Sequence, residues 1–222
     1  HFQKHLKDKF IHFANAGFQK EKEKGVNLYF EKPETLRAPI KVILGHKVNY
    51  KTRLLIPNND IKEVVIFRNP IDWEISRFNQ HANRLLKHHN KRLDFEYWLS
   101  SVNKTHSQFD WFLANYLLLG KSVNNISSAA KENILIYILS KFDYVFFVDD
   151  LDTQLKIIFK KLSIPETIKR ENVVGGDKPQ FFDGSRKNID LLNTICKNDM
   201  NTFKTIKSIF SISNHLGSNK SL

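Results

Sequence analysis

An arginine, an Asn-Pro pair and a serine follow one another at a spacing suited to binding a phosphate group. Arg68 comes directly after the apolar run 64–67, and Asn69 and Pro70 are residue types that begin helices. A guanidinium group beside the positive end of a helix dipole attracts anions. Ser76 lies six residues beyond Pro70, under two helical turns, so its hydroxyl can reach the same anion. For each residue taken alone there is a structural alternative, in which the arginine only caps the edge of a sheet and the serine only faces solvent. Together with Asn69 and Pro70, the two residues indicate a phosphate site.

His46 is a second candidate for chemistry. It follows Gly45 at the end of the apolar run 40–44, which predicts a buried strand. Ligands of parallel sheets bind beyond the carboxyl ends of the strands. A neutral imidazole placed there can accept a proton from a hydroxyl group. A histidine that only forms a hydrogen bond at the strand end is the structural alternative.

The elements that position these residues are predicted from apolar periodicity. Phe2, Leu6, Phe10 and Phe13 recur at helical spacing and predict an amphipathic helix over 1–13. Further helices are predicted at about 71–88, 94–101, 106–119, 127–141, 151–162, 186–197 and 199–210, and strands at 26–30, 40–44, 64–67 and 142–148. This alternation is typical of an α/β fold with three layers, a mainly parallel central sheet flanked by helices.

Composition narrows the class of protein. The chain has 222 residues, 41% of them hydrophobic, which fits a single globular domain over 1–222. The single cysteine, Cys196, excludes an internal disulfide. With 35 Lys and Arg against 23 Asp and Glu, the net charge of +12 favours anionic partners. No apolar run approaches the ~18–20 residues of a membrane span, so we expect no span and a cytoplasmic location, or the Golgi lumen if an anchor precedes His1.

Two segments carry a resemblance to a known family. Phe67-Arg-Asn-Pro-Ile-Asp-Trp-Glu-Ile-Ser76 resembles the 3′-phosphate-binding motif of sulfotransferases that use 3′-phosphoadenosine-5′-phosphosulfate (PAPS), in which Arg-X-Pro is followed by a serine six residues after the proline. The resemblance implies that Arg68 and Ser76 hold the 3′-phosphate. Leu44-Gly-His46 is similar to the Gly-His element of the carbohydrate-type branch, which implies that His46 is the catalytic base.

Two further segments look like later parts of the same family. The segment 143–155 looks like its late strand and following helix. Gly175-Gly-Asp-Lys178 resembles, in its place along the chain, the late loop that closes over the nucleotide, which implies that Lys178 contacts the cofactor; a plain turn is the alternative. The family's first strand and its 5′-phosphosulfate loop are not found in this sequence, and we expect them upstream of His1.

The resemblance implies a P-loop-NTPase-like sulfotransferase fold and the transfer of a sulfuryl group from PAPS to an acceptor hydroxyl on a carbohydrate. An acidic glycan suits the positive charge, and the reaction needs no metal ion. A nucleotide or small-molecule kinase is the nearest alternative, but its Gly-X-X-X-X-Gly-Lys-Ser/Thr loop is not in these 222 residues. A basic nucleic-acid-binding module is another, but the basic residues are dispersed among acidic ones and no nucleic-acid-binding motif is found.

Overall fold

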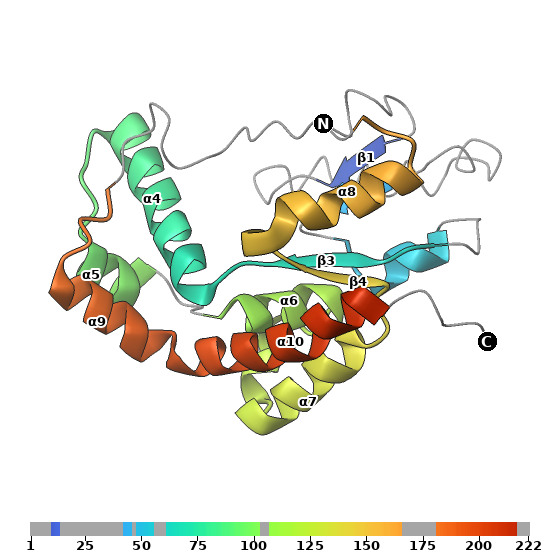
Figure 1. Cartoon of the computed structure of the whole chain (residues 1–222). Helices are drawn as coiled ribbons and strands as arrows, with labels where there is room; N and C mark the ends of the chain where they lie inside the picture. The colour runs from blue at the N-terminus through green and yellow to red at the C-terminus, as the bar shows by residue number, and fades with distance from the viewer. Residues whose placement is uncertain are drawn as a thin grey trace. The chain divides into compact units, whose positions relative to one another are not determined.

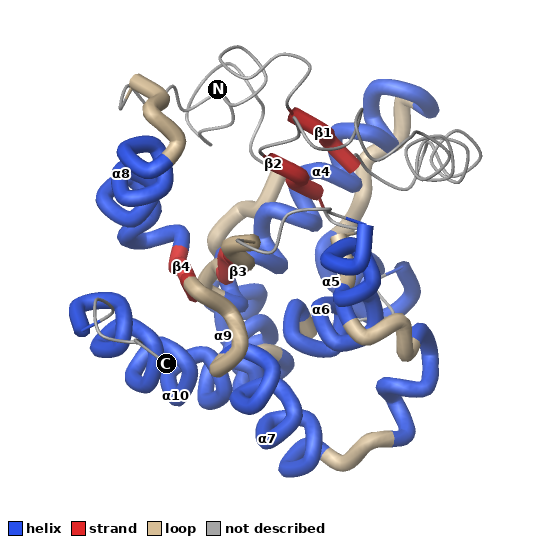
Figure 2. The backbone as a smooth tube through the Cα atoms, turned by 90° about the vertical axis from the view of Figure 1, so that its right-hand side faces the viewer, coloured by secondary structure: helices blue, strands red, loops and turns tan. Residues whose placement is uncertain are grey.

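The computed structural model describes residues 10–13, 42–45, 48–55, 61–102, 107–165 and 181–216, which are mostly helical (Figures 1 and 2). The chain divides into two compact units. The first comprises 1–63, 112–127 and 152–169, and the second comprises 64–111, 128–151 and 170–222. Over the described ranges, no helix combines the length and the apolar character that crossing a membrane requires.

The first unit contains a two-stranded parallel sheet. Strand β1 (Phe10–Phe13) pairs with β2 (Val42–Gly45), with Phe10 opposite Val42 and Phe13 opposite Gly45. The predicted helix over 1–13 is therefore wrong at Phe10–Phe13. Four residues form barely one helical turn, whereas the aromatic and β-branched types Phe-Ile-His-Phe suit a strand that finds a partner. The 3₁₀-helices Tyr50–Leu55 and Gly120–Asn125, which the sequence did not predict, also belong to this unit.

The second unit contains another two-stranded parallel sheet and most of the helices. Strand β3 (Val64–Phe67) pairs with β4 (Tyr144–Phe147), with Phe67 opposite Phe147. Beyond the 3₁₀-helices of the first unit, the described helices of the whole chain are, in order, α4 (Pro70–His89), α5 (Phe95–Tyr97), the π-helix Trp98–Val102, α6 (Gln108–Tyr116), α7 (Ser128–Leu139), the 3₁₀-helix Val148–Asp150, α8 (Leu151–Lys161), α9 (Arg186–Ile195) and α10 (Lys197–Leu216). Two of these helices cross the boundary between the units: α6 passes into the first unit at Phe112, and α8 at Asp152.

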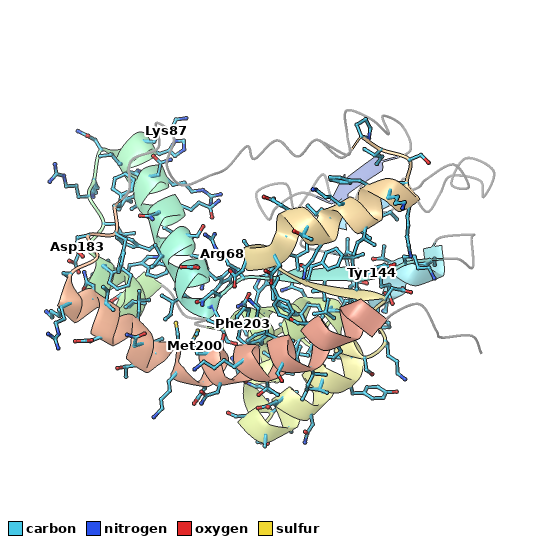
Figure 3. All side chains as sticks on the ribbon, viewed as in Figure 1. Arg68, Lys87, Tyr144, Asp183, Met200 and Phe203 are labelled. Carbon is cyan, nitrogen blue, oxygen red and sulfur yellow. The ribbon has the colours of Figure 1, made fainter. Side chains whose placement is uncertain are left out.

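Aromatic side chains hold the sheet of the second unit to its helices. The ring of Phe67 on β3 lies 5.2 Å from that of Phe109 on α6, and the ring of Phe147 on β4 lies 5.5 Å from that of Phe203 on α10. Figure 3 shows Phe203 on α10. All four are nearly fully buried, and burying each such ring contributes about 2–3 kcal/mol relative to leaving it in water. The end of β3 is thereby fixed against α6.

Helix α4 begins and ends with asparagine. The side chain of Asn69 accepts a hydrogen bond from the backbone N–H of Ile71 at 3.0 Å, and Pro70 occupies the first helical position. Asn90 ends the helix in the left-handed conformation, with φ 50°. The face of α4 that carries Phe78 and Ala82 packs against Phe95 and Trp98. The predicted strand–helix junction is confirmed.

The predicted fold class is confirmed only at the coarser level. Helices alternate with parallel strands, but the described strands form two separate two-stranded sheets rather than one central sheet. The expected three-layer arrangement is therefore not shown. The predicted strand at 26–30 lies outside the described residues.

Candidate anion-binding site

Arg68 is placed where the sequence predicts, at the carboxyl end of β3 and directly before α4 (Figure 3). The preceding residue, Phe67, is almost fully buried, whereas Arg68 is partly buried. Its Nε atom is buried and has no hydrogen-bond partner among the described residues. No ion pair within this part of the chain neutralises its guanidinium group. A buried cationic donor without a partner is costly unless an acceptor bonds to it, and an anion is the acceptor that also offsets its charge.

The first turn of α4 offers few free backbone N–H donors to an anion. Pro70 has no backbone N–H group, and that of Ile71 already donates to the side chain of Asn69. The N–H group of Trp73 donates to the carbonyl oxygen of Asn69 at 2.9 Å. The attraction of this helix end for an anion therefore depends more on side chains than on backbone N–H groups.

Ser76 lies on α4 six residues beyond Pro70, which is about 9 Å along the helix axis at ~1.5 Å per residue. Its side chain is partly exposed, and its hydroxyl forms no hydrogen bond with the described residues. Arg68 and Ser76 do not contact each other directly. The structure thus places Arg68 directly before α4 and Ser76 in the second turn of that helix. The Ser76 side chain is partly exposed, whereas the Arg68 Nε atom is enclosed by the protein.

Gln108, at the start of α6, contacts the backbone of Arg68 with both ends of its side-chain amide. Its Oε1 accepts a hydrogen bond from the N–H group of Arg68 at 3.2 Å, and its Nε2 donates to the carbonyl oxygen of Arg68. The N–H group of Gln108 in turn donates to Oδ2 of Asp199 on α10 at 3.2 Å. Neither Gln108 nor Asp199 lies within a motif, and nothing in the sequence around them signals a contact with Arg68, so these two residues are not predictable from local patterns.

A cluster of aromatic and basic side chains lies further along α4. The guanidinium group of Arg77 sits 4.4 Å from the ring centre of Trp73 and forms a 2.9 Å ion pair with the fully buried Glu74. His81 accepts a hydrogen bond at Nδ1 from Trp98 Nε1. Burial, followed by the charges of Arg77 and Arg84, lowers the pKa of His81. The imidazole is therefore held neutral, with its remaining proton on Nε2.

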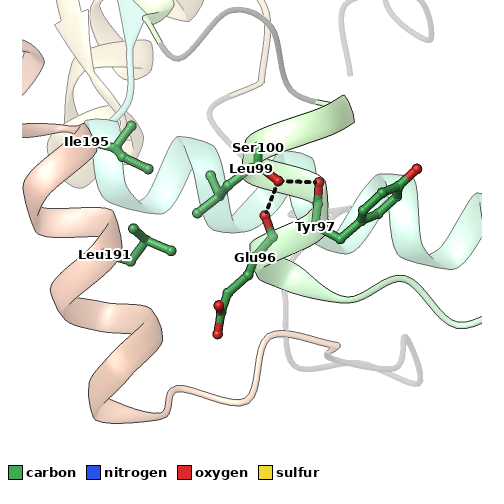
Figure 4. A pocket seen from close by; sticks show the side chains of 6 residues that line it. All are labelled: Glu96, Tyr97, Leu99, Ser100, Leu191 and Ile195. Carbon is green, nitrogen blue, oxygen red and sulfur yellow. Dashed lines mark hydrogen bonds between the residues drawn. The ribbon is translucent and has the colours of Figure 1, made fainter.

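A shallow groove of about 360 Å³ lies between α5 with its following π-helix and α9 (Figure 4). Its walls are Leu99, Leu191 and Ile195, and Glu96, Tyr97 and Ser100 form its rim. Two of the polar rim groups, those of Glu96 and Ser100, are already bonded within the protein. The Ser100 hydroxyl donates to the carbonyl oxygen of Glu96 at 2.9 Å, and the carboxylate of Glu96 pairs with Lys187 at 2.5 Å. We assign no ligand to this groove.

The other two predicted site residues, His46 and Lys178, lie outside the described residues. Within the described ranges there is no group of three His, Cys, Asp or Glu side chains that could hold a metal ion. Burial raises the pKa of the Cys196 thiol to about 12. That thiol is therefore protonated and unreactive at neutral pH.

Comparisons of the chain with protein-family models, curated proteins and solved structures found no match.

Proposed function

We propose that the junction between β3 and α4 binds a phosphate group of a nucleotide, and that the protein is a PAPS-dependent sulfotransferase. The observation that carries this proposal is the buried Nε atom of Arg68, which has no partner among the described residues at the carboxyl end of a parallel strand. Ser76 adds an available hydroxyl on the adjoining helix. Both positions match the 3′-phosphate motif that the sequence resembles.

Under this proposal Arg68 and Ser76 hold the 3′-phosphate of PAPS, and Lys178 contacts the nucleotide. His46 takes the proton of the acceptor hydroxyl as its oxygen attacks the sulfur atom. The bond between sulfur and the bridging phosphate oxygen breaks, and adenosine 3′,5′-bisphosphate leaves. Such a transfer depends on positioning and on cations that stabilise the leaving group. A three-layer sheet, completed by a first strand and phosphosulfate loop upstream of His1, is part of the same proposal.

The proposed acceptor is a hydroxyl group on an acidic carbohydrate. The net charge of +12 exceeds what one nucleotide needs. Arg77 and Arg84 share α4 with Ser76, and the sequence places Lys47, Lys51 and Arg53 shortly after His46. These cations would attract a polyanionic chain towards the proposed site.

Calorimetric titration of the chain with adenosine 3′,5′-bisphosphate, ATP and duplex DNA tests the class of protein. We expect the bisphosphate to bind and the other two not to bind. Arg68→Ala should weaken the bisphosphate by about 10–100-fold, because a charge-assisted contact is worth roughly 1.5–3 kcal/mol.

Arg92→Ala is the matched control for this loss. It removes the same charge from an exposed loop position, and it should bind the bisphosphate as the parent does. Unchanged affinity in Arg68→Ala would contradict the nucleotide site. Tight binding of ATP would instead favour a kinase.

A further inference from the structure

Arg68 is held in place by a residue from another helix. The side-chain amide of Gln108 satisfies both the N–H group and the carbonyl oxygen of Arg68, as an adjacent strand would. Gln108 is almost fully buried, so this double contact is shielded from water. The direction in which the Arg68 side chain leaves the backbone therefore depends on where the first turn of α6 lies.

The first turn of α6 is in turn held by Asp199 from α10. Oδ2 of Asp199 accepts the hydrogen bond of the Gln108 N–H group at 3.2 Å, and the hydroxyl of Ser107 donates to the same carboxylate. A carboxylate at a helix N-terminus accepts from free N–H groups and complements the helix dipole. Arg68, Gln108 and Asp199 thus form a chain of contacts that joins β3, α6 and α10.

Several charged and titratable groups face the Asp199 carboxyl. Asp110 of α6 repels its charge, whereas Lys131 of α7, itself paired with Asp110 at 2.8 Å, attracts it. The Cys196 thiol also interacts electrostatically with the Asp199 carboxylate. Burial is the largest influence, and together these groups raise the pKa of Asp199 to about 6. Asp199 consequently gains a proton within the range of mildly acidic compartments.

An asparagine at position 199 would accept the same hydrogen bonds without a buried charge. The ionised carboxylate therefore makes the fold less stable than an asparagine would. What the carboxylate adds is a stronger hydrogen bond with the N–H group of Gln108. Asp199 thus lowers the stability of the fold but strengthens the support of Arg68. A role in the anion site explains this combination better than a role in packing does.

We propose that Gln108 and Asp199 are positioning residues for Arg68, and that protonation of Asp199 loosens the anion site. The proposal rests on the proposed function, because it takes Arg68 as the ligand of a phosphate group. Ionised Asp199 anchors α6, Gln108 then fixes the Arg68 backbone, and the guanidinium group points to the ligand. Below about pH 6 the neutral carboxyl holds Gln108 less firmly, and the ligand binds more weakly.

The test compares the parent with Asp199→Asn by calorimetry with adenosine 3′,5′-bisphosphate at about pH 7.5 and about pH 5. We expect the variant to bind about two- to fivefold more weakly at the higher pH, because a neutral acceptor replaces a charged one. At the lower pH both chains carry an uncharged group at position 199, and their affinities should converge. The ligand's own phosphate titrates near pH 6, but this affects both chains equally.

Asp190→Asn is the matched control, since it makes the same change at an exposed carboxylate of α9. It should bind the ligand like the parent at both pH values. Gln108→Met keeps the side-chain size but removes both bonds to Arg68, so it should weaken binding at both pH values. Adding Asp199→Asn to Gln108→Met should then have no further effect, because Asp199 acts through Gln108.

Equal affinities of the parent and Asp199→Asn at about pH 7.5 would overturn the inference, as would an equal loss at both pH values or additive effects in the double variant. Failure of the proposed function looks different. In that case the parent does not bind the bisphosphate, or Arg68→Ala binds it like the parent, and the inference falls with it.

Discussion

The indole Nε1 atom of Trp98 donates a 2.8 Å hydrogen bond to Nδ1 of His81. Trp98 is fully buried in the core beneath α4, so this bond fixes both the ring orientation and the tautomer of a partly exposed histidine. The Nε2–H group of His81 is then a neutral donor on the helix that carries Arg77 and Arg84. A protonated imidazole could not accept the Trp98 bond, so the pair is sensitive to acid.

His81 should make the fold less stable in acid. Its pKa is lowered by burial and by the charges of Arg77 and Arg84, so the unfolded chain takes up the proton first. The contribution of neutral His81 to the stability of the fold is therefore fully present above pH 6.5, and it is lost as the pH falls through the folded-state pKa of His81. In His81→Asn the amide oxygen can still accept the hydrogen bond from Trp98 but does not titrate. The free energy of unfolding, measured with urea, should therefore depend less on pH in this range than it does in the parent. His88→Asn changes an exposed histidine of the same helix, and an equal flattening there would contradict the assignment.

Asp199 should act on stability in the opposite direction. Its pKa rises from 3.8 to about 6 on folding, so the folded state binds the proton more tightly. Stability is then lost as the pH rises from about 4 to about 6. Asp199→Asn should stabilise the fold by about 1–3 kcal/mol near pH 7.5, an amount that allows for partial exposure to solvent. The melting temperature measures this gain, which Asp190→Asn should not show; a lower melting temperature would contradict the cost of the buried charge.

Ser76→Ala should weaken adenosine 3′,5′-bisphosphate less than Arg68→Ala does. It removes one neutral hydroxyl contact, worth about 0.5–1.5 kcal/mol. Calorimetry on the full chain measures the difference. Ser122→Ala, at an exposed position of the first unit, is the control. A loss in Ser76→Ala as large as in Arg68→Ala would mean that the serine does more than donate one hydrogen bond.

His46→Ala should affect turnover and not the binding of the nucleotide product. A general base acts on the acceptor hydroxyl, so sulfate transfer should fall by about 10²–10⁴-fold. The affinity for adenosine 3′,5′-bisphosphate should stay near that of the parent. If rate and affinity fall together, His46 is a nucleotide ligand instead.

Sulfate transfer should favour acidic saccharides and should weaken with salt. If Arg77, Arg84 and the lysines near His46 attract a polyanion, adding salt removes the entropy gained from released counterions. Initial rates with acidic and neutral saccharides, from about 50 to 300 mM salt, measure this effect across the range where screening becomes strong. Transfer that is independent of salt, or that prefers neutral acceptors, would exclude the acidic glycan.

Local patterns predicted the junction between β3 and α4 well. Asn69, Pro70 and the apolar run before them carry their own signals for a helix start and a buried strand, and the observed helix Pro70–His89 agrees with the predicted 71–88. Phe10–Phe13 failed because apolar residues at helical spacing also fit one short strand. Pairing with β2 decides between them, and that partner lies about thirty residues away along the chain.

The candidate site was predicted only in part, for a related reason. Arg68 and Ser76 belong to one continuous segment whose residue types indicate anion binding. Gln108 and Asp199 reach Arg68 through the tertiary fold, from 40 residues away and then a further 91. An acidic residue in the first turn of a helix, such as Asp199, is ordinarily explained by the helix dipole alone, so its sequence context gives no sign of the second contact.

The same separations determine when the site can exist during folding. Strand β3 and helix α4 are neighbours along the chain and can form early, whereas the contact of Gln108 with Asp199 closes a loop of 91 residues. Until α10 docks, the Arg68 backbone lacks its support even if α4 is already helical. We therefore expect partly folded chains to have no affinity for the nucleotide, and local detachment of α10 to switch the site off without unfolding the helix that carries Ser76.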